Sequence, residues 1–340
     1  MSRYIVGVIV AFGLNAFVPN IAQALQGQTN SFITEQIEQQ QALARASAEG
    51  EQWFKRMQEA LNSLNYRASF IAMQPSGLQA YRWLHSVTPA GNHIEVIEGL
   101  NGPHNQAIRI NSQVTYLSSV SDAYSVLSNT LSSPILSGLY GEYSAISHAY
   151  NVVAVGGDRV VDRDAQHLRI IPHARDRYLY SVWVDRETGL LLGVNTYLPS
   201  GDIVEQVLLT SIHVQAEPLT ELEQLEQQWD NLPTNQGPVA TPATATKWQF
   251  GWLPPGFRLE RQQRVRVAMN GPVAEHFMFS DGMAKFSVYI SEGNDQVVPV
   301  QYENLMSMVS VKHNNYAVTA VGKIPLKIAQ QVTAAVRLTP

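Results

Sequence analysis

The chain has 340 residues, of which 45% are hydrophobic and 15% are charged, and its formal net charge is -5. The length leaves room for two domains, because a single hydrophobic core rarely serves more than about 250 to 300 residues. The negative charge disfavours a nucleic-acid-binding function. The absence of cysteine excludes disulfides and a lipid-modified N-terminal cysteine.

The first residues have the pattern of an export signal. Arg3 precedes an apolar run at residues 4–17, and Ala22 and Ala24 are small residues at the two positions that a signal peptidase reads. The alternative, a membrane anchor, is disfavoured because a bilayer needs about 20 apolar residues. We therefore predict a cleaved export signal at residues 1–24.

A change of pattern follows the signal. Residues 25–46 are rich in Gln and poor in large apolar residues, so we expect a mobile arm or a loosely attached helix. Ser47 is a suitable N-cap for a helix over residues 48–64. Apolar residues at helical spacing there indicate one buried face, formed by Trp53, Met57, Ala60, Leu61 and Leu64.

Residues 47–216 are expected to form an antiparallel sheet with covering helices. Turn residues separate short runs rich in β-branched and aromatic residues, which is the pattern of a meander rather than of βαβ units. The clearest hairpin joins two arms at residues 185–189, where Gly189 can adopt the positive φ of a tight turn. Loops and short helices are predicted over residues 120–150. The predicted strands are 66–74, 79–86, 93–98, 106–110, 113–117, 152–155, 159–162, 168–172, the two arms of 177–197, and 203–214.

A second, smaller domain is predicted at residues 248–340. It follows an acidic helix and a linker rich in Pro and Thr, together residues 217–247. Residues 25–246 carry a net charge of -10 and residues 247–340 a net charge of +4, which indicates different partners for the two domains. Strands are expected at 257–267, 273–280, 284–290, 308–312 and 316–322, and a final helix at 325–338.

Four segments resemble the RseB/MucB family of periplasmic sigma-E regulators. They are NYRASFIA at residues 65–72, YLYSVWVDRETG at 178–189, LPPGF at 253–257 and the SDG…FSVYI segment at 280–290. The resemblance implies an α+β protein: an antiparallel, LolA-like half-barrel wrapped around helices, plus a smaller antiparallel α/β domain. It also implies that the chain binds the periplasmic segment of an anti-sigma factor of the RseA or MucA type and protects it from proteolysis. Lipopolysaccharide or mislocalised lipid would relieve that inhibition.

An open half-barrel leaves an apolar concave face that must be filled by helices or remain a trough for an acyl chain or peptide. For each aromatic residue, the alternative is an ordinary core position. The candidate trough residues are Phe70, Tyr81, Trp83, Tyr178, Tyr180, Trp183, Leu136 and Leu139.

Four arginines of the second domain form a candidate patch for an anionic partner. The two-residue period of a strand places Arg258, Arg264 and Arg266 on one face and Arg261 on the other. Arginine suits carboxylates and phosphates because its planar fork donates two parallel hydrogen bonds. The alternative is a solvated outer face.

No enzyme motif is evident, so we expect neither catalysis nor a cofactor. The histidines are scattered, and His85 and His93 lack a third ligand for a metal. The carboxylates near residues 158–187 fit turn chemistry. The remaining alternative function is a periplasmic lipid or lipoprotein carrier, and a homo-oligomer stays open. The sequence leaves domain movement and direct competition equally open as routes for release of the anti-sigma segment.

Overall fold

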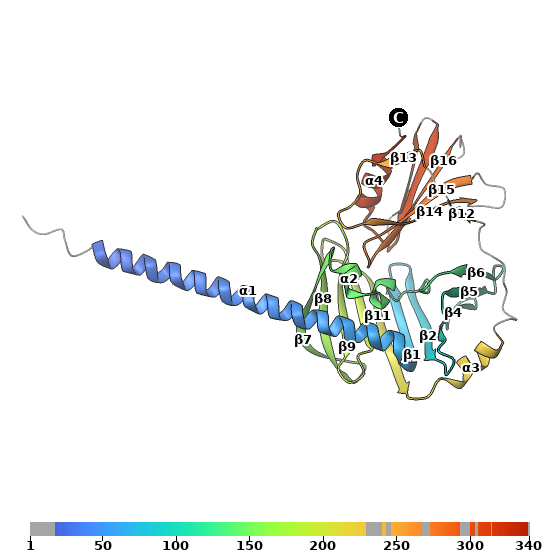
Figure 1. Cartoon of the computed structure of the whole chain (residues 1–340), viewed down its shortest axis with the longest axis horizontal. Coiled ribbons are helices and arrows are strands. Elements are labelled where there is room, and N and C mark those ends of the chain that lie inside the picture. The colour runs from blue at the N-terminus through green and yellow to red at the C-terminus, as the bar shows by residue number, and fades with distance from the viewer. Residues whose placement is uncertain are drawn as a thin grey trace, which may run out of the picture. The chain divides into compact units, whose positions relative to one another are not determined.

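In the part of the chain that the structure describes, two antiparallel sheets dominate, one of eleven strands and one of seven, with a further two-stranded sheet. The computed structural model describes residues 18–228, 240–242, 246–266, 273–292, 300–302, 305–313 and 315–338. The larger sheets follow one another along the chain (Figure 1). The predicted fold class, a curved antiparallel sheet around helices followed by a smaller antiparallel domain, is confirmed.

The first helix, α1 (Val18–Ser63), is 46 residues long. The described residues up to Ala46 and those from Ser47 onward belong to two separate units. Because α1 includes residues 25–46, the Gln-rich segment is helical. Residues 1–17 of the predicted signal peptide lie outside the described residues. Among the described residues, no helix is long and apolar enough to cross a membrane.

The last turns of α1 lie against the first sheet, as their apolar stripe predicts. Met57 and Leu61 are fully buried in the main core. Phe54 is also fully buried, although the sequence pattern suggested its neighbour Trp53, which is only half-buried. At Gly50 the helix touches strand backbone directly, because a Cβ there would stand 2.4 Å from the carbonyl oxygen of Val152.

The first sheet has the order β6-β5-β4-β3-β2-β1-β11-β10-β9-β8-β7. The predicted hairpin is present, and Gly189 has a φ of +82°. The strands predicted at 152–155 and 159–162 are one strand, because the reversal falls at Val161 and Asp162, which have positive φ. The strands are β1 (Asn65–Gln74), β2 (Gly77–Val87), β3 (His93–Gly99), β4 (Asn105–Ile110), β5 (Gln113–Ser118), β6 (Tyr124–Leu127), β7 (Tyr150–Val160), β8 (Arg163–Pro172), β9 (Leu179–Asp185), β10 (Leu191–Tyr197) and β11 (Ile203–Gln215).

Short elements cover one face of this sheet. The segment between β6 and β7 contributes the 3-10 helix η1 (Ser137–Tyr140) and the helix α2 (Tyr143–Ile146). On the opposite face, the predicted acidic helix is the short α3 (Thr220–Gln227), which packs Leu222 into a small separate core with Leu84, Val96 and Ile108. The covering segments predicted over residues 120–150 are therefore confirmed, apart from strand β6.

The second domain has the strand order β12-β14-β15-β16-β19-β18-β17. Two predictions are wrong at its ends. Residues 240–242, predicted as linker, pair with β14, and the last helix ends at Ala335 because residues 336–338 pair with residues 248–250. The elements are β12 (Ala240–Pro242), β13 (Trp248–Phe250), β14 (Arg258–Arg266), β15 (Val273–Ser280), β16 (Lys285–Glu292), β17 (Val300–Tyr302), β18 (Ser307–His313), β19 (Tyr316–Gly322), α4 (Leu326–Ala335) and β20 (Val336–Leu338).

The contact at Gly50 predicts that an alanine at this helix position lowers the stability of the protein rather than raising it. Gly50→Ala in a helix normally stabilises by about 1 kcal/mol. Here the added methyl meets the β7 backbone, and overpacking of this kind costs about 1 to 3 kcal/mol, so we expect net destabilisation in urea titrations. Glu49→Ala, at the exposed neighbouring position, is the control and should change stability by less than about 0.5 kcal/mol. A more stable Gly50→Ala variant would contradict the contact.

Candidate functional site

The predicted trough is filled by the chain itself. Six of its eight proposed residues are buried in the main core, together with residues of α1 and of the covering segment. Tyr81 is half-buried at the edge of that core and stacks on Phe70, with ring centroids 4.9 Å apart. The buried six are Phe70, Trp83, Leu136, Leu139, Tyr178 and Tyr180.

Trp183 lies on the opposite face of the sheet from the other trough residues. Its indole stacks on His167 at 4.9 Å, and its Nε1 donates to Asp158. A shallow groove of about 200 Å³ beside it is lined by Ile71 and Leu208 among others. Trp183 is therefore not part of a concave trough, because it alternates with the inward-facing Val182 and Val184 along β9.

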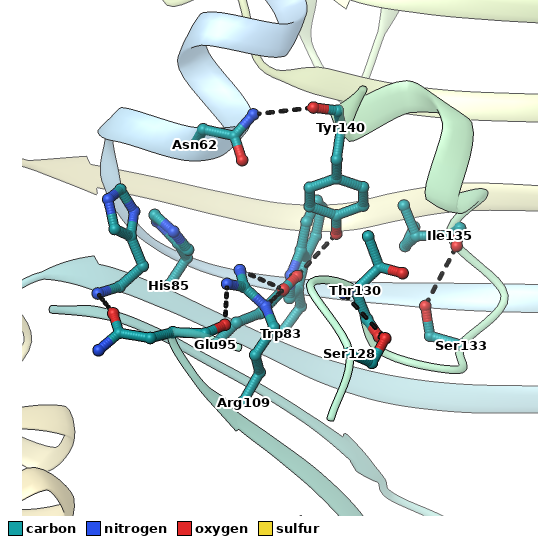
Figure 2. Close-up of polar contacts among 12 residues, drawn as sticks. Asn62, Trp83, His85, Glu95, Arg109, Ser128, Thr130, Ser133, Ile135 and Tyr140 are labelled. Atoms are coloured by element: carbon teal, nitrogen blue, oxygen red, sulfur yellow. Dashed lines mark hydrogen bonds and ion pairs between the residues drawn. The ribbon is translucent and has the colours of Figure 1, made fainter. Parts of the chain in front are cut away.

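Residues 128–140, which we term the lid, fill the concave face. The lid side chains Leu131, Ile135, Leu136 and Leu139 are all buried in the main core. Polar contacts fix the lid at both ends. The Ser132 N–H donates to the Tyr116 hydroxyl at 3.0 Å. Asn62 donates to the Tyr140 carbonyl oxygen at 3.2 Å, a contact drawn in Figure 2.

Beneath the lid lies a buried carboxylate, Glu95, which is 1% exposed. Its Oε1 accepts from the Tyr140 hydroxyl at 2.7 Å and from Trp83 Nε1 at 2.9 Å. Its Oε2 accepts from Arg109 Nε and Nη2 at 3.1 and 2.9 Å. Figure 2 shows these three partners converging on Glu95 from β2, β4 and the lid. The tyrosine hydrogen bond therefore ties the lid to the sheet from inside the core.

Burial sets the ionisation of the groups around this carboxylate. Burial, followed by the charge of Glu95, raises the pKa of Tyr140 and of Tyr66 well above the ordinary value, so both phenols stay protonated. Burial lowers the pKa of His85, which favours the neutral ring. The Tyr66 hydroxyl and His85 Nε2 are buried without a hydrogen-bond partner in the described part of the chain.

The accessible cavity lies on the other side of the lid. It has a volume of about 360 Å³ and is walled by the lid, by Tyr180 and by the second domain. Its lining is mostly apolar, and Lys285 and Lys323 stand in its wall. Lys323 Nζ lies 3.5 Å from the buried Glu205 carboxylate of β11, and Lys285 Nζ pairs with Glu260. The arrangement suits an apolar chain with an anionic group at one end. This junction cavity includes only Leu136 and Tyr180 of the proposed trough residues.

The four arginines of β14 are distributed over the two faces of the strand differently from the prediction. The register of β14 on β15 shifts between Leu259 and Arg261, and this bulge reverses the alternation of faces. Opposed residues share a face, so Arg258 and Arg261 lie with Ser280 and Met278, whereas Arg264 and Arg266 lie on the face of Phe277 and Phe279. The prediction that Arg258 shares a face with Arg264 and Arg266 is therefore wrong.

The two arginine faces have different surroundings. Phe277 and Phe279 pack into the core with α4, so Arg264 and Arg266 share their face with that core, and both arginine side chains are exposed beside it. Lys285, Ser287 and Tyr289 pair with Ser280, Met278 and His276, and all three line the cavity. The exposed Arg258 and Arg261 thus belong to the face of the second sheet that carries the cavity wall.

Within the described residues, no group of three or more potential ligands could hold a metal ion. His85 and His93 do approach, with ring centroids 6.2 Å apart. The Asp185 side chain accepts a hydrogen bond within its own turn, as predicted. Burial raises its pKa, but hydrogen bonds from Arg163 and Thr188 outweigh burial and lower the pKa below the ordinary value.

Sequence patterns missed the charged residues that organise the site. Glu95 stands within the apolar run of β3, and Arg109 within that of β4. A single charge in an otherwise buried run is the signal that could have found each of them, since such a charge needs a partner. Asp281, in the turn between β15 and β16, belongs to a motif that carried the family resemblance, but nothing local marked it as buried.

The fold and the cavity are those of a two-domain binding protein, and no catalytic centre is recognisable among the residues that the structure describes. Family comparisons agree domain by domain. The MucB/RseB N-terminal domain profile matches residues 49–233 and the MucB/RseB C-terminal domain profile matches residues 242–337. The chain belongs to the MucB/RseB family.

Individual relatives are distant but span nearly the whole chain. The Sigma-E factor regulatory protein RseB of Haemophilus influenzae is 24% identical, covering 86% of this chain and 93% of the relative. The Sigma factor AlgU regulatory protein MucB of Pseudomonas aeruginosa is 25% identical, covering 86% and 92%. These relatives are named as regulatory proteins, which agrees with the expectation that the chain is not an enzyme.

Solved structures confirm the fold. The complex structure of Pseudomonas aeruginosa MucA/MucB contains a chain with a TM-score of 0.69 and 22% identity, covering 86% of this chain and 99% of that one. The crystal structure of MucB in complex with MucA(peri) gives a TM-score of 0.67 at 23% identity, covering 85% of this chain and 98% of that one.

The buried Glu95 cluster predicts unequal effects for two arginines of the same sheet. Arg109→Met leaves a buried carboxylate without its cation, which costs about 3 to 5 kcal/mol. Arg82→Met removes a comparable pair with Glu98 at 3.1 Å, but that arginine is half exposed, so the cost should be about 0 to 1 kcal/mol. Urea titrations of the two variants provide the comparison. Equal losses would contradict the burial of the Glu95 cluster.

Proposed function

We propose that this chain is a negative regulator of an envelope-stress sigma factor. It binds the periplasmic segment of a membrane-bound anti-sigma factor, protects that segment from proteolysis, and releases it when lipopolysaccharide or mislocalised lipid binds. The observation that carries the proposal is the family match across both domains. Support for the partner comes from the relatives, since one solved structure is that of MucB in complex with MucA(peri).

The place of action is proposed to be the periplasm. The apolar run before residue 17 and the small residues at 22 and 24 support export. The regulatory relatives support it further, because an anti-sigma segment outside the inner membrane requires a partner in the same compartment.

The face of the second sheet that carries Arg258 and Arg261 is the proposed site for acidic groups of the anti-sigma segment. Both side chains are exposed, and the net charge of the second domain is positive. Lys285 lies on the same face, opposite Ser280. Electrostatic attraction of this kind adds affinity that falls as salt rises.

The bulge in β14 supplies a matched pair of variants for this site. Arg258→Gln with Arg261→Gln should weaken binding of a fluorescent anti-sigma periplasmic segment by about ten-fold at low salt and flatten its salt dependence. Arg264→Gln with Arg266→Gln removes the same charge from the other face and should leave affinity unchanged. Anisotropy titrations measure both. Equal effects would contradict the assignment of this face, and failure of the unaltered chain to bind or protect the segment would refute the function.

The junction cavity is the proposed lipid site. Its apolar wall can take an acyl chain, and Lys285 and Lys323 can approach a phosphate at the chain's polar end. A periplasmic lipid or lipoprotein carrier is the alternative function that this cavity also favours. The carrier would bind lipid without binding the anti-sigma segment.

A cavity-filling variant tests the lipid site. Val321 lines the cavity and is half-buried, so Val321→Trp should abolish the signal of a fluorescent fatty-acid probe. Ser291→Trp, on the same sheet but outside the cavity lining, is the control and should keep the signal. Lipopolysaccharide should displace the probe and release the segment, whereas displacement by phospholipid alone would favour the carrier. Undiminished probe binding by Val321→Trp would remove the cavity from the account.

A further inference from the structure

The turn between β15 and β16, residues 281–284, lies where the second domain meets the first. Asp281 is fully buried. Its Oδ1 accepts from the N–H groups of Met283 and Ala284 at 3.0 and 2.8 Å. Its Oδ2 accepts from the Tyr150 hydroxyl at 2.9 Å and from Arg177 Nη1 at 2.8 Å. One oxygen therefore holds the turn, and the other holds the first domain.

Arg177 is committed to this junction. Its side chain is 3% exposed, and its other nitrogens donate to Asp176 and to the carbonyl oxygen of Pro255. The ring of Phe257 lies 5.1 Å from the guanidinium carbon. A buried charge pair is stable only when its remaining hydrogen-bonding groups are also satisfied, and here they are. The Arg177 and Asp281 pair is thus a specific contact that fixes the position of the turn against the first domain.

The backbone of the turn also lies directly against the backbone of the lid and of α2. Gly282 has a φ of +93°, and a Cβ at that position would stand 2.3 Å from the carbonyl oxygen of Ala145 in α2. A Cβ on Gly138, within the lid, would stand 2.5 Å from the carbonyl oxygen of Gly282. Two glycines therefore let the turn press directly on the lid and on α2.

The turn also contributes to the core of the other domain. Met283 is 2% exposed and belongs to the main core of the first domain, which includes the lid residues Leu136 and Leu139. Withdrawal of the second domain would remove this side chain and open a gap beside the lid. An apolar lid next to a water-filled gap loses part of its burial, which weakens its closed state.

We propose that the Asp281 to Ala284 turn is a latch that keeps the lid closed, so that lid opening and separation of the two domains are one coupled transition. The Glu95 and Tyr140 hydrogen bond holds the lid from inside the core, and the latch holds it from outside. An occupant of the junction cavity, whatever its identity, would then affect the interior of the first domain by displacing this turn. The proposal concerns the chain alone and does not depend on which partner or lipid it binds.

The absence of cysteine from the sequence permits a direct test on the full chain. Leu139 is fully buried under the latch, so Leu139→Cys reports lid opening through its rate of labelling by a thiol reagent. Adding Arg177→Gln should raise that rate at least about ten-fold, because the loss of one buried charge leaves the other without its partner. Small-angle scattering should show a larger radius of gyration in the same variant.

Two further variants separate the latch from general damage. Tyr150→Phe removes one hydrogen bond to Asp281 and should raise the labelling rate by a smaller factor than Arg177→Gln. Glu260→Gln breaks the exposed pair with Lys285 on the second domain, and it should leave both the labelling rate and the radius of gyration unchanged.

Three results would overturn the proposal. One is an unchanged labelling rate in Arg177→Gln. Another is faster labelling without a larger radius of gyration, because lid and domains would then move separately. The third is labelling that rises only in step with global unfolding, followed by tryptophan fluorescence under the same conditions. Faster labelling together with a larger radius of gyration, while tryptophan fluorescence stays native, would support the latch.

Discussion

The structure depends on one constraint, that the apolar concave face of an open antiparallel sheet cannot remain in contact with water. The chain meets it with its own segments. The last turns of α1 bury Phe54, Met57 and Leu61 against one part of the face, and the lid buries four apolar side chains against another. The chain therefore fills this interior itself, and a cavity of about 360 Å³ remains where the lid meets the second domain.

Buried charged residues fix the position of the lid on the sheet. Hydrophobic contacts between the lid and the sheet are non-directional, so they favour closure without fixing a single position. Glu95 on one side of the lid and Asp281 beside the other supply directional contacts in a low-dielectric environment, where an unmet partner is costly. If the proposed latch holds, the lid would have two discrete states rather than a continuous range, which is the property that the proposed release needs. The proposed latch would unite domain movement and direct competition, since an occupant of the cavity would act on both domains.

The sequence predicted most of the fold because turn residues and alternating patterns mark antiparallel strands well. It failed where tertiary pairing overrides local pattern. Residues 240–242 and 336–338 become strands only because distant partners are available, and the bulge after Leu259 reverses which arginines share a face. Most proposed trough residues proved to be core, because alternation shows which face is apolar but not what covers it. The roles of Glu95, Arg109 and Asp281 depend on contacts across the fold, which no local pattern records.

Hydrogen exchange of the full chain tests the central claim most directly. Amides of residues 128–140 and of residues 281–284 would be followed in the free protein and with saturating lipopolysaccharide. A lid and a latch that belong to one transition should lose protection together, at the same lipid concentration and by similar factors. Loss of protection in the lid while the turn stays protected, or no change in either segment when lipid binds, would contradict a clamped interior that opens as a unit.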